Sequence, residues 1–199
     1  MDLSEPPLFY SARFDKALQF AAEWHDQEYR KGTKTPYMVH PVAVAFLLQS
    51  YGYAENVKIA GLLHDVVEDT ECSLEQIEEI FGKSVSEVVN WCTELSKGRS
   101  WEERKSAMIE KLKSAPLEAK AVAAADKAHN LNTILDVWDR EGESVWNRFS
   151  RGSNQQLKYY QQILESIGMG FSDSILNELK DAVRRFEMKI MAGEPSEND

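Results

Sequence analysis

The amino-acid sequence predicts an all-α fold of about eight or nine helices. Apolar residues recur at the three-to-four-residue spacing of amphipathic helices along nearly the whole chain. No stretch combines the alternating pattern of a strand with the turn residues of a hairpin. Of the 199 residues, 43% are hydrophobic and 10% are aromatic, which is enough apolar material for a core. We therefore expect one folded domain over residues 11–192, after a leader at 1–10 and before a flexible tail at 193–199.

The first half of the chain contains five predicted helices. Three cover residues 11–29, 39–51 and 55–68, and a loop between the first two follows from Gly32 and Pro36. Two more begin at Ser73 and Ser84, because each serine opens the Ser-x-x-Gln/Glu pattern of a capping box. Gly82 fits the break between these two helices.

The second half contains four predicted helices, near residues 101–112, 117–137, 154–167 and 173–191. The second of these includes the run AVAAAD at residues 121–126, whose small apolar side chains allow close packing against other helices. We expect most of the chain's aromatic residues to pack in the core between these helices.

The charge of the chain excludes several classes of partner. Acidic residues outnumber basic ones by 33 to 23, so the net charge is −10, which disfavours bulk nucleic acid and anionic membranes. No apolar run approaches the ~20 residues of a membrane-spanning helix. Cys72 and Cys92 form neither a disulfide framework nor a zinc motif. We expect a cytoplasmic protein that binds neither nucleic acid nor membranes.

Four polar residues in apolar surroundings predict a metal site. His64 and Asp65 follow the apolar run at residues 59–63, where a carboxylate needs a compensating cation or hydrogen bonds. His40 starts a predicted helix at the end of the loop, and Asp126 follows five apolar residues. Two imidazoles and two carboxylates from three helices would form a mixed nitrogen and oxygen site, suited to manganese, iron or zinc.

Glu68 and Asp69 add two carboxylates beside the His-Asp pair. On a continuous helix, Glu68 lies one turn after His64 and Asp69 one turn after Asp65, so all four groups share a face. Because like charges repel at this spacing, a divalent cation is the better explanation. A solvated acidic helix end is the alternative for Glu68 and Asp69.

Three further residues have less specific interpretations. His25 belongs to a second His-Asp pair among polar neighbours, and we expect it to have a role other than metal binding. Lys127 follows Asp126, but adjacent helical residues do not face each other, so a metal is the sharper partner for Asp126. His129 either supports a ligand or packs as a polar core residue.

These residues lie in motifs that resemble one known family. The order His40 … His64-Asp65 … Asp126 resembles the H…HD…D signature of HD-domain metal-dependent phosphohydrolases. Three segments are also similar to motifs of the Rel/Spo alarmone hydrolase domain: HDQEYRKGTKTPYMVHP (25–41), GLLHDVVEDT (61–70) and AADKAHNL (124–131). The resemblance covers residues 14–165 and is closer to single-domain small alarmone hydrolases than to long bifunctional enzymes.

The resemblance implies a reaction and a set of site residues. The reaction removes the 3′-pyrophosphate from guanosine tetra- or pentaphosphate, giving GDP or GTP and pyrophosphate. The implied Mn²⁺ ligands are His40, His64, Asp65 and Asp126. The implied catalytic residues are Glu68 and Asp69. The residues expected to bind the nucleotide are Arg30, Lys31, Asn130 and Thr133, with Lys127 as a further phosphate contact.

Two alternatives stay open at this point. The first is an HD phosphohydrolase that acts on another nucleotide phosphate ester, and the second is a nucleotide-binding module without turnover. The sequence departs from the family pattern at Thr33-Lys34-Thr35 and at Asn132, and residues 139–152 align poorly. These segments would shape the nucleotide pocket, so they bear on the substrate more than on the metal site. The oligomeric state is not predicted.

Overall fold

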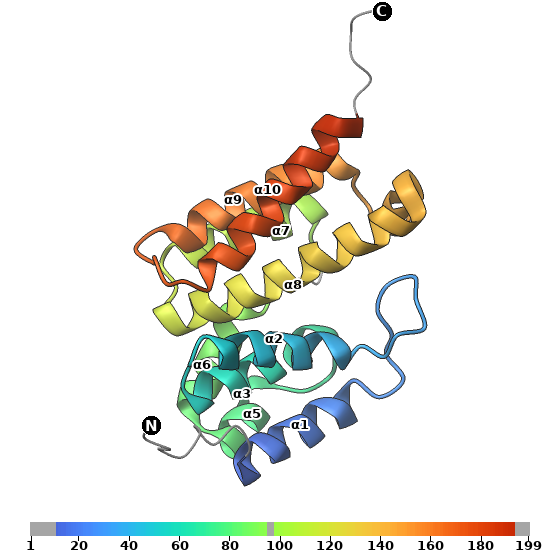
Figure 1. Ribbon diagram of the computed structural model, residues 1–199. Helices are drawn as coiled ribbons and strands as arrows, with labels where there is room; N and C mark the ends of the chain where they lie inside the picture. Colours follow the sequence, from blue (N-terminus) through green and yellow to red (C-terminus); the bar gives the residue numbers. More distant parts are fainter. Residues whose placement is uncertain (1–10, 95–97, 194–199) are drawn as a thin grey trace, which may run out of the picture. The chain divides into compact units, whose positions relative to one another are not determined.

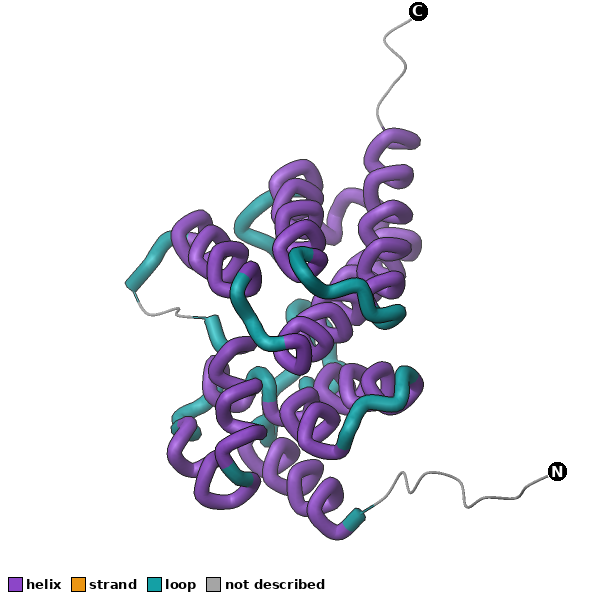
Figure 2. The backbone as a smooth tube through the Cα atoms, turned by 90° about the vertical axis from the view of Figure 1, so that its left-hand side faces the viewer, coloured by secondary structure: helices purple, strands orange, loops and turns teal. Residues whose placement is uncertain are grey.

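The computed structural model describes residues 11–94 and 98–193, which form helices joined by loops (Figures 1 and 2). The chain divides into two compact units, Met1–Thr93 and Glu94–Asp199, and each is described by itself. Within the described ranges the regular structure is helical, apart from one antiparallel bridge between Tyr29 and Pro36. The all-α prediction is confirmed. The single domain over 11–192 stays a prediction. The leader predicted at 1–10 lies outside the described residues, and so does the tail predicted at 193–199 apart from Gly193, which ends the last helix.

The first unit is built around helix α3. Its helices are α1 (Ala12–Trp24), α2 (Val39–Ser50), α3 (Glu55–Leu63), α4 (Val66–Asp69), α5 (Leu74–Phe81) and α6 (Lys83–Cys92). Helix α3 packs against α1, α2 and α6, and every residue from 57 to 63 is buried. Gly61 permits the close approach of α2, because a Cβ atom there would lie 2.5 Å from Leu48 Cδ1.

Helix ends in this unit follow the capping signals in part. The Ser73–Gln76 capping box is present in both directions and begins α5 as predicted. The capping box predicted at Ser84 is wrong, because α6 begins at Lys83 and Gly82 stands at its N-cap. Gly82 has φ +89°, so this one residue ends α5 and starts α6. Ser84 Oγ instead accepts a hydrogen bond from Asn56 Nδ2 at 2.8 Å.

The second unit is built around the long helix α8. Its elements are α7 (Trp101–Lys113), α8 (Leu117–Glu141), the 3₁₀ helix η1 (Gly142–Arg148), α9 (Ser153–Gly168) and α10 (Leu176–Gly193). Helix α8 packs against α10, α9 and η1, and the small residues of its first half are buried. Figure 1 shows α10 running alongside α8 and α9. Helix α8 continues four residues beyond its predicted end, into the segment that aligns poorly with the family motifs.

Aromatic rings and one lysine fill the core of the second unit. Trp146 stacks on Phe186 with 5.6 Å between ring centroids, and Trp138 meets both rings edge-on. Lys120 is buried, and its Nζ donates hydrogen bonds to the backbone carbonyls of Lys113 and Met169. These carbonyls lie at the C-terminal ends of α7 and α9, where the helix dipole favours a cation. None of the described helices combines the length and the apolar character needed to cross a lipid bilayer.

Candidate metal centre and its surroundings

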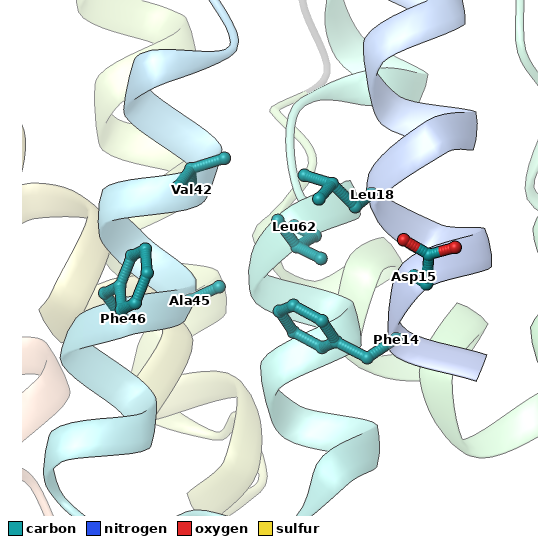
Figure 3. Close-up of a pocket in the computed structure, with 7 residues that line it drawn as sticks. All are labelled: Phe14, Asp15, Leu18, Val42, Ala45, Phe46 and Leu62. Atoms are coloured by element: carbon teal, nitrogen blue, oxygen red, sulfur yellow. The ribbon is translucent and has the colours of Figure 1, made fainter. Parts of the chain in front are cut away.

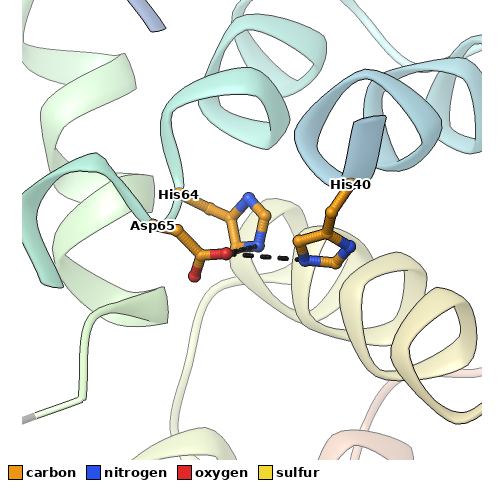
Figure 4. A group of neighbouring side chains, drawn as sticks. All are labelled: His40, His64 and Asp65. Carbon is orange, nitrogen blue, oxygen red and sulfur yellow. Dashed lines mark ion pairs between the residues drawn. The ribbon is translucent and has the colours of Figure 1, made fainter. Parts of the chain in front are cut away.

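Three of the four predicted metal ligands converge in the first unit. His40 lies in the first turn of α2, and His64 and Asp65 form the turn between α3 and α4. Asp65 Oδ2 lies 3.1 Å from His64 Nε2 and 3.5 Å from His40 Nε2 (Figure 4). Both histidines are buried, whereas 18% of the Asp65 side chain is exposed. Across the described part of the chain, these three form the one group of His, Cys, Asp or Glu side chains whose ligand atoms gather this closely.

The turn that presents His64 and Asp65 differs from the predicted continuous helix over 55–68. Helix α3 ends at Leu63 and α4 begins at Val66. His64 Nδ1 lies 2.8 Å from the carbonyl oxygen of Gly61, which an uninterrupted helix would pair with the amide of residue 65. A side chain that competes for a helical carbonyl in this way favours a helix end. The prediction that four groups lie on one helical face is therefore wrong.

The hydrogen bonding of the cluster fits a divalent cation. Because Gly61 offers only an acceptor, His64 Nδ1 carries the hydrogen, and the lone pair of a neutral imidazole is then on Nε2. Burial opposes ionisation of Asp65, but when the imidazoles carry protons on Nε2, the charge of His64 and hydrogen bonds from both histidines outweigh burial and hold the pKa of Asp65 well below its usual range. The lone pairs of the two imidazole nitrogens and the charge of the Asp65 carboxylate repel one another unless a proton or a cation lies between them. Two imidazoles and one carboxylate are ligands that manganese, iron and zinc accept.

Glu68 and Asp69 lie on α4, directly after the cluster. Glu68 is half-buried and Asp69 is exposed, and neither belongs to the group of three that could share an ion. Burial of the carboxyl, together with the charge of Asp65, raises the pKa of Asp69 to about 6, although the nearby Tyr37 hydroxyl opposes this shift. A carboxylate with a raised pKa is a stronger base than an ordinary aspartate.

The loop between α1 and α2 carries the predicted basic residues. Helix α1 ends at Trp24 rather than at 29, because Gln27 adopts φ +61°, which a helix does not allow. The backbone bridge between Tyr29 and Pro36 then closes a short loop, within which the amide of Arg30 donates to the carbonyl oxygen of Thr35 at 2.9 Å. The Arg30 guanidinium lies over the Tyr37 ring at 5.5 Å.

Tyr37 is a residue of this site that the sequence did not predict as a contact of the metal ligands, since most aromatic residues were expected to pack in the core. Its hydroxyl donates a hydrogen bond of 2.6 Å to Asp65 Oδ2. Its position three residues before His40, in a Pro-Tyr pair that ends the loop, is the signal that could have pointed to it.

The remaining predicted site residues lie on α8 in the second unit. Asp126 is buried and pairs with Lys127 Nζ through Oδ2, while Asn130 Nδ2 donates to Oδ1 at 2.5 Å. The argument that Lys127 cannot face its neighbour is wrong, since its long side chain bends back to Asp126. Burial opposes the charge of Lys127, but the charge of Asp126 and its hydrogen bond with the ammonium outweigh burial, so the pKa of Lys127 is raised. The Thr133 hydroxyl donates to the carbonyl of His129 in the same helix.

An apolar pocket in the first unit is separate from the predicted ligands. It lies between α1, α2 and α3, has a volume of about 120 Å³, and carries one charged residue, Asp15, among apolar side chains (Figure 3). Phe14, Leu18, Phe46 and Leu62 form most of its wall. Such a lining offers no partners for phosphate groups.

The fold and the cluster define a class of protein: an all-helical chain with two buried histidines and an aspartate gathered at helix ends. A family model described as HD domain matches residues 17–152. The chain therefore belongs to the HD-domain family. Within that family it is a Rel/Spo-type hydrolase and is similar to the single-domain small alarmone hydrolases.

Individual relatives agree with this assignment. The chain is 39% identical over 127 residues to the Drosophila melanogaster guanosine-3′,5′-bis(diphosphate) 3′-pyrophosphohydrolase MESH1, a match that spans 62% of this chain and 70% of the relative. A probable guanosine-3′,5′-bis(diphosphate) 3′-pyrophosphohydrolase from Synechocystis is 40% identical over 124 residues, which is 60% of this chain and 16% of that much longer relative. The solved structure of a metazoan ortholog of SpoT that hydrolyses ppGpp superposes with a TM-score of 0.74 at 30% identity, over 88% of this chain and 96% of that chain.

Proposed function

We propose that this protein removes the 3′-pyrophosphate from guanosine 3′,5′-bis(diphosphate), releasing GDP and pyrophosphate, and acts likewise on the pentaphosphate to give GTP. One observation carries the proposal: the His40, His64 and Asp65 side chains gather within ligand distance in a chain similar to relatives named for this reaction. An acidic protein needs local basic groups to bind such a polyanion, and the loop at Arg30 and Lys31 supplies two.

We propose Mn²⁺ as the resident metal, with His40, His64, Asp65 and Asp126 as its ligands. The donor set of two imidazoles and carboxylates supports a transition metal, and the motif resemblance supports manganese. When bound, such a metal lowers the pKa of a water molecule and polarises a phosphoryl oxygen. Asp126 would exchange its ion pair with Lys127 for the metal, which leaves the Lys127 ammonium available to a phosphate group.

The other side chains then have distinct tasks. Glu68 or Asp69 accepts the proton of the attacking water, and the raised pKa of Asp69 supports a role as base. Arg30 and Lys31 offset the charge of the leaving pyrophosphate. Asn130 and Thr133 contact the nucleotide in this proposal, as the family motif implies. We also propose a cytoplasmic location, which the two cysteines support, because they form neither a disulfide framework nor a zinc motif in the sequence.

The first experiment measures pyrophosphate release from guanosine 3′,5′-bis(diphosphate) with and without Mn²⁺. Wild type should release pyrophosphate only with the metal, and Asp65→Ala should lose both metal binding and activity. Glu68→Ala should bind Mn²⁺ normally and lose turnover. Glu71→Ala is the matched control, because it removes an exposed carboxylate just beyond α4 and should behave like wild type.

The result also separates the alternatives. Bound Mn²⁺ without pyrophosphate release would contradict the alarmone substrate and direct the search to other nucleotide phosphate esters. Nucleotide binding without release from any of them would leave a binding module. Normal Mn²⁺ affinity in Asp126→Ala would remove that residue from the ligand set.

A further inference from the structure

A layer of side chains lies behind the metal-binding group, and the proposed reaction uses none of them directly. Tyr37 is the residue of this layer closest to the ligands. Its hydroxyl donates to Asp65 Oδ2 at 2.6 Å, and its ring meets the His40 ring edge-on with 6.0 Å between centroids. Tyr37 therefore contacts two of the three clustered ligands from a position outside the cluster.

The Tyr37 ring is itself held in place. The imidazole of His25 lies 4.7 Å from it between centroids, and the side chain of His25 is completely buried. His25 Nδ1 is 2.6 Å from Glu28 Oε2, which fixes the plane of the imidazole. The amide of Tyr37 donates to the carbonyl of Glu28 at 2.8 Å, so the backbone at this point is fixed as well.

The chemistry of His25 indicates more than space filling. Its Nε2 is buried and has no hydrogen-bond partner among the residues that the structure describes. A buried polar atom in this state costs free energy, so an apolar ring would fill the same volume at lower cost. An imidazole differs from an apolar ring in one respect: its hydrogen bond with Glu28 fixes the orientation of the ring that lies against Tyr37.

We propose that Tyr37 is a positioning residue: its hydroxyl holds the Asp65 carboxylate toward His40 and His64, while His25 and Glu28 hold Tyr37. The ligand set is then preformed before an ion arrives. The 2.6 Å bond from a hydroxyl to an ionised carboxylate belongs to the stronger class of hydrogen bonds and restricts rotation of the Asp65 side chain. Because Arg30 lies over the same ring, Tyr37 also connects the metal ligands to the basic loop. This inference rests on the proposed function for the identity of the site.

The test compares Tyr37→Phe with Tyr29→Phe. Both variants remove one phenolic oxygen from the same loop, but Tyr29 is 56% exposed and forms a backbone bridge with Pro36. The dissociation constant of Mn²⁺ is measured from the electron paramagnetic resonance signal of the free ion. Tyr37→Phe should weaken Mn²⁺ binding by about tenfold or more, as outer ligand contacts commonly do. Tyr29→Phe should bind as wild type does. Equal affinity in wild type and Tyr37→Phe would overturn the proposal.

Turnover separates positioning from a direct catalytic role. At saturating Mn²⁺, Tyr37→Phe should recover most of its kcat, because the ion then organises the ligands itself. Glu68→Ala should not recover under the same conditions. A Tyr37→Phe variant that binds Mn²⁺ weakly and stays inactive at saturation would overturn a purely positioning role.

The part of the proposal that concerns His25 has its own variants. Glu28→Ala removes the acceptor for His25 Nδ1 and should weaken Mn²⁺ binding in the same direction, though less than Tyr37→Phe. Glu28→Gln keeps an acceptor oxygen and should restore the affinity, so equal values for the two Glu28 variants would overturn this part.

Failure of this inference is distinguishable from failure of the proposed function. If wild type releases pyrophosphate and Tyr37→Phe matches it at every Mn²⁺ concentration, only the inference fails. If Tyr37→Phe weakens Mn²⁺ binding but wild type releases no pyrophosphate, the inference stands and the substrate proposal fails.

Discussion

Replacing Gly61 with alanine should destabilise the first unit, although alanine is the better helix former. In a helix interior this exchange gains about 1 kcal/mol from propensity alone. The added Cβ, however, would lie 2.5 Å from Leu48 Cδ1 and 3.3 Å from Val44 Cγ1. Leu48 and Val44 are both completely buried, so neither has solvent to move into. Overpacking of this kind costs about 1–3 kcal/mol, and with so close an approach we expect a net loss of about 1–2 kcal/mol.

The same change should weaken metal binding. Helix α2 carries His40, and α3 leads into His64, so forcing these helices apart separates the two imidazoles. The carbonyl of Gly61 also fixes the His64 ring. A weaker Mn²⁺ affinity in Gly61→Ala, measured alongside stability, would therefore share one cause with the loss of packing.

Urea unfolding of the metal-free protein, followed by circular dichroism, measures the effect on stability. Gly168→Ala is the matched control, because its Cβ would meet Leu176 Cδ2 at an ordinary 3.8 Å, and it should leave stability unchanged or raise it. Leu48→Val removes the methyl group that Gly61→Ala would strike, so the double variant should be more stable than the sum of the single effects. The reasoning is refuted if Gly61→Ala raises stability as Gly168→Ala does, or if the double variant is merely additive.

Three further predictions concern single residues. Ser73→Ala removes the capping box of α5 and should lower the free energy of unfolding by about 1 kcal/mol, as measured by urea unfolding, whereas Ser73→Asp should largely preserve it. The pKa of Asp69 is raised from 3.8 to about 6, so the folded state loses stability as the pH rises from about 4 to about 6. In the metal-free protein, Asp69→Asn should remove this loss. The gain in melting temperature over wild type should grow up to about pH 6 and then stay constant. Lys127→Met leaves the largely buried Asp126 carboxylate without its ion pair and should cost about 1–3 kcal/mol in the metal-free protein. Saturating Mn²⁺ should raise the melting temperature of Lys127→Met more than that of wild type, and an equal rise would contradict a metal-binding role for Asp126.

The helices could be predicted largely from periodicity, whereas their exact ends could not. The capping box at Ser73 is a local signal, because all its atoms come from four consecutive residues. The failed capping box at Ser84 shows the limit of such signals, since the N-cap of α6 is Gly82, two residues earlier, with its positive φ. The break between α3 and α4 depends on the side chain of His64 reaching a backbone carbonyl, and an apolar pattern carries no information about that contact.

The candidate site could be predicted where polar residues interrupt apolar runs. His64 and Asp65 stand out for this reason, and the structure places them beside His40. Tyr37 gave no such signal, because a tyrosine in a loop is compatible with many roles. Its contact with Asp65 joins residues 28 positions apart and depends on the tertiary structure that brings the loop to the turn between α3 and α4. The pairing of Lys127 with Asp126 was missed because backbone geometry alone does not limit where a long side chain ends.

The burial of Lys120 makes the labelling rate of its amine a measure of local opening in the second unit. Its amine is enclosed and donates to backbone carbonyls at the ends of α7 and α9, so an acylating reagent reaches it only when this region opens. Exposed lysines such as Lys31 and Lys34 react without any opening. The ratio of the two labelling rates, read by mass spectrometry, therefore measures how often the helices around Lys120 separate in the native protein. A nucleotide that stabilises the second unit would slow labelling of Lys120 without contacting it.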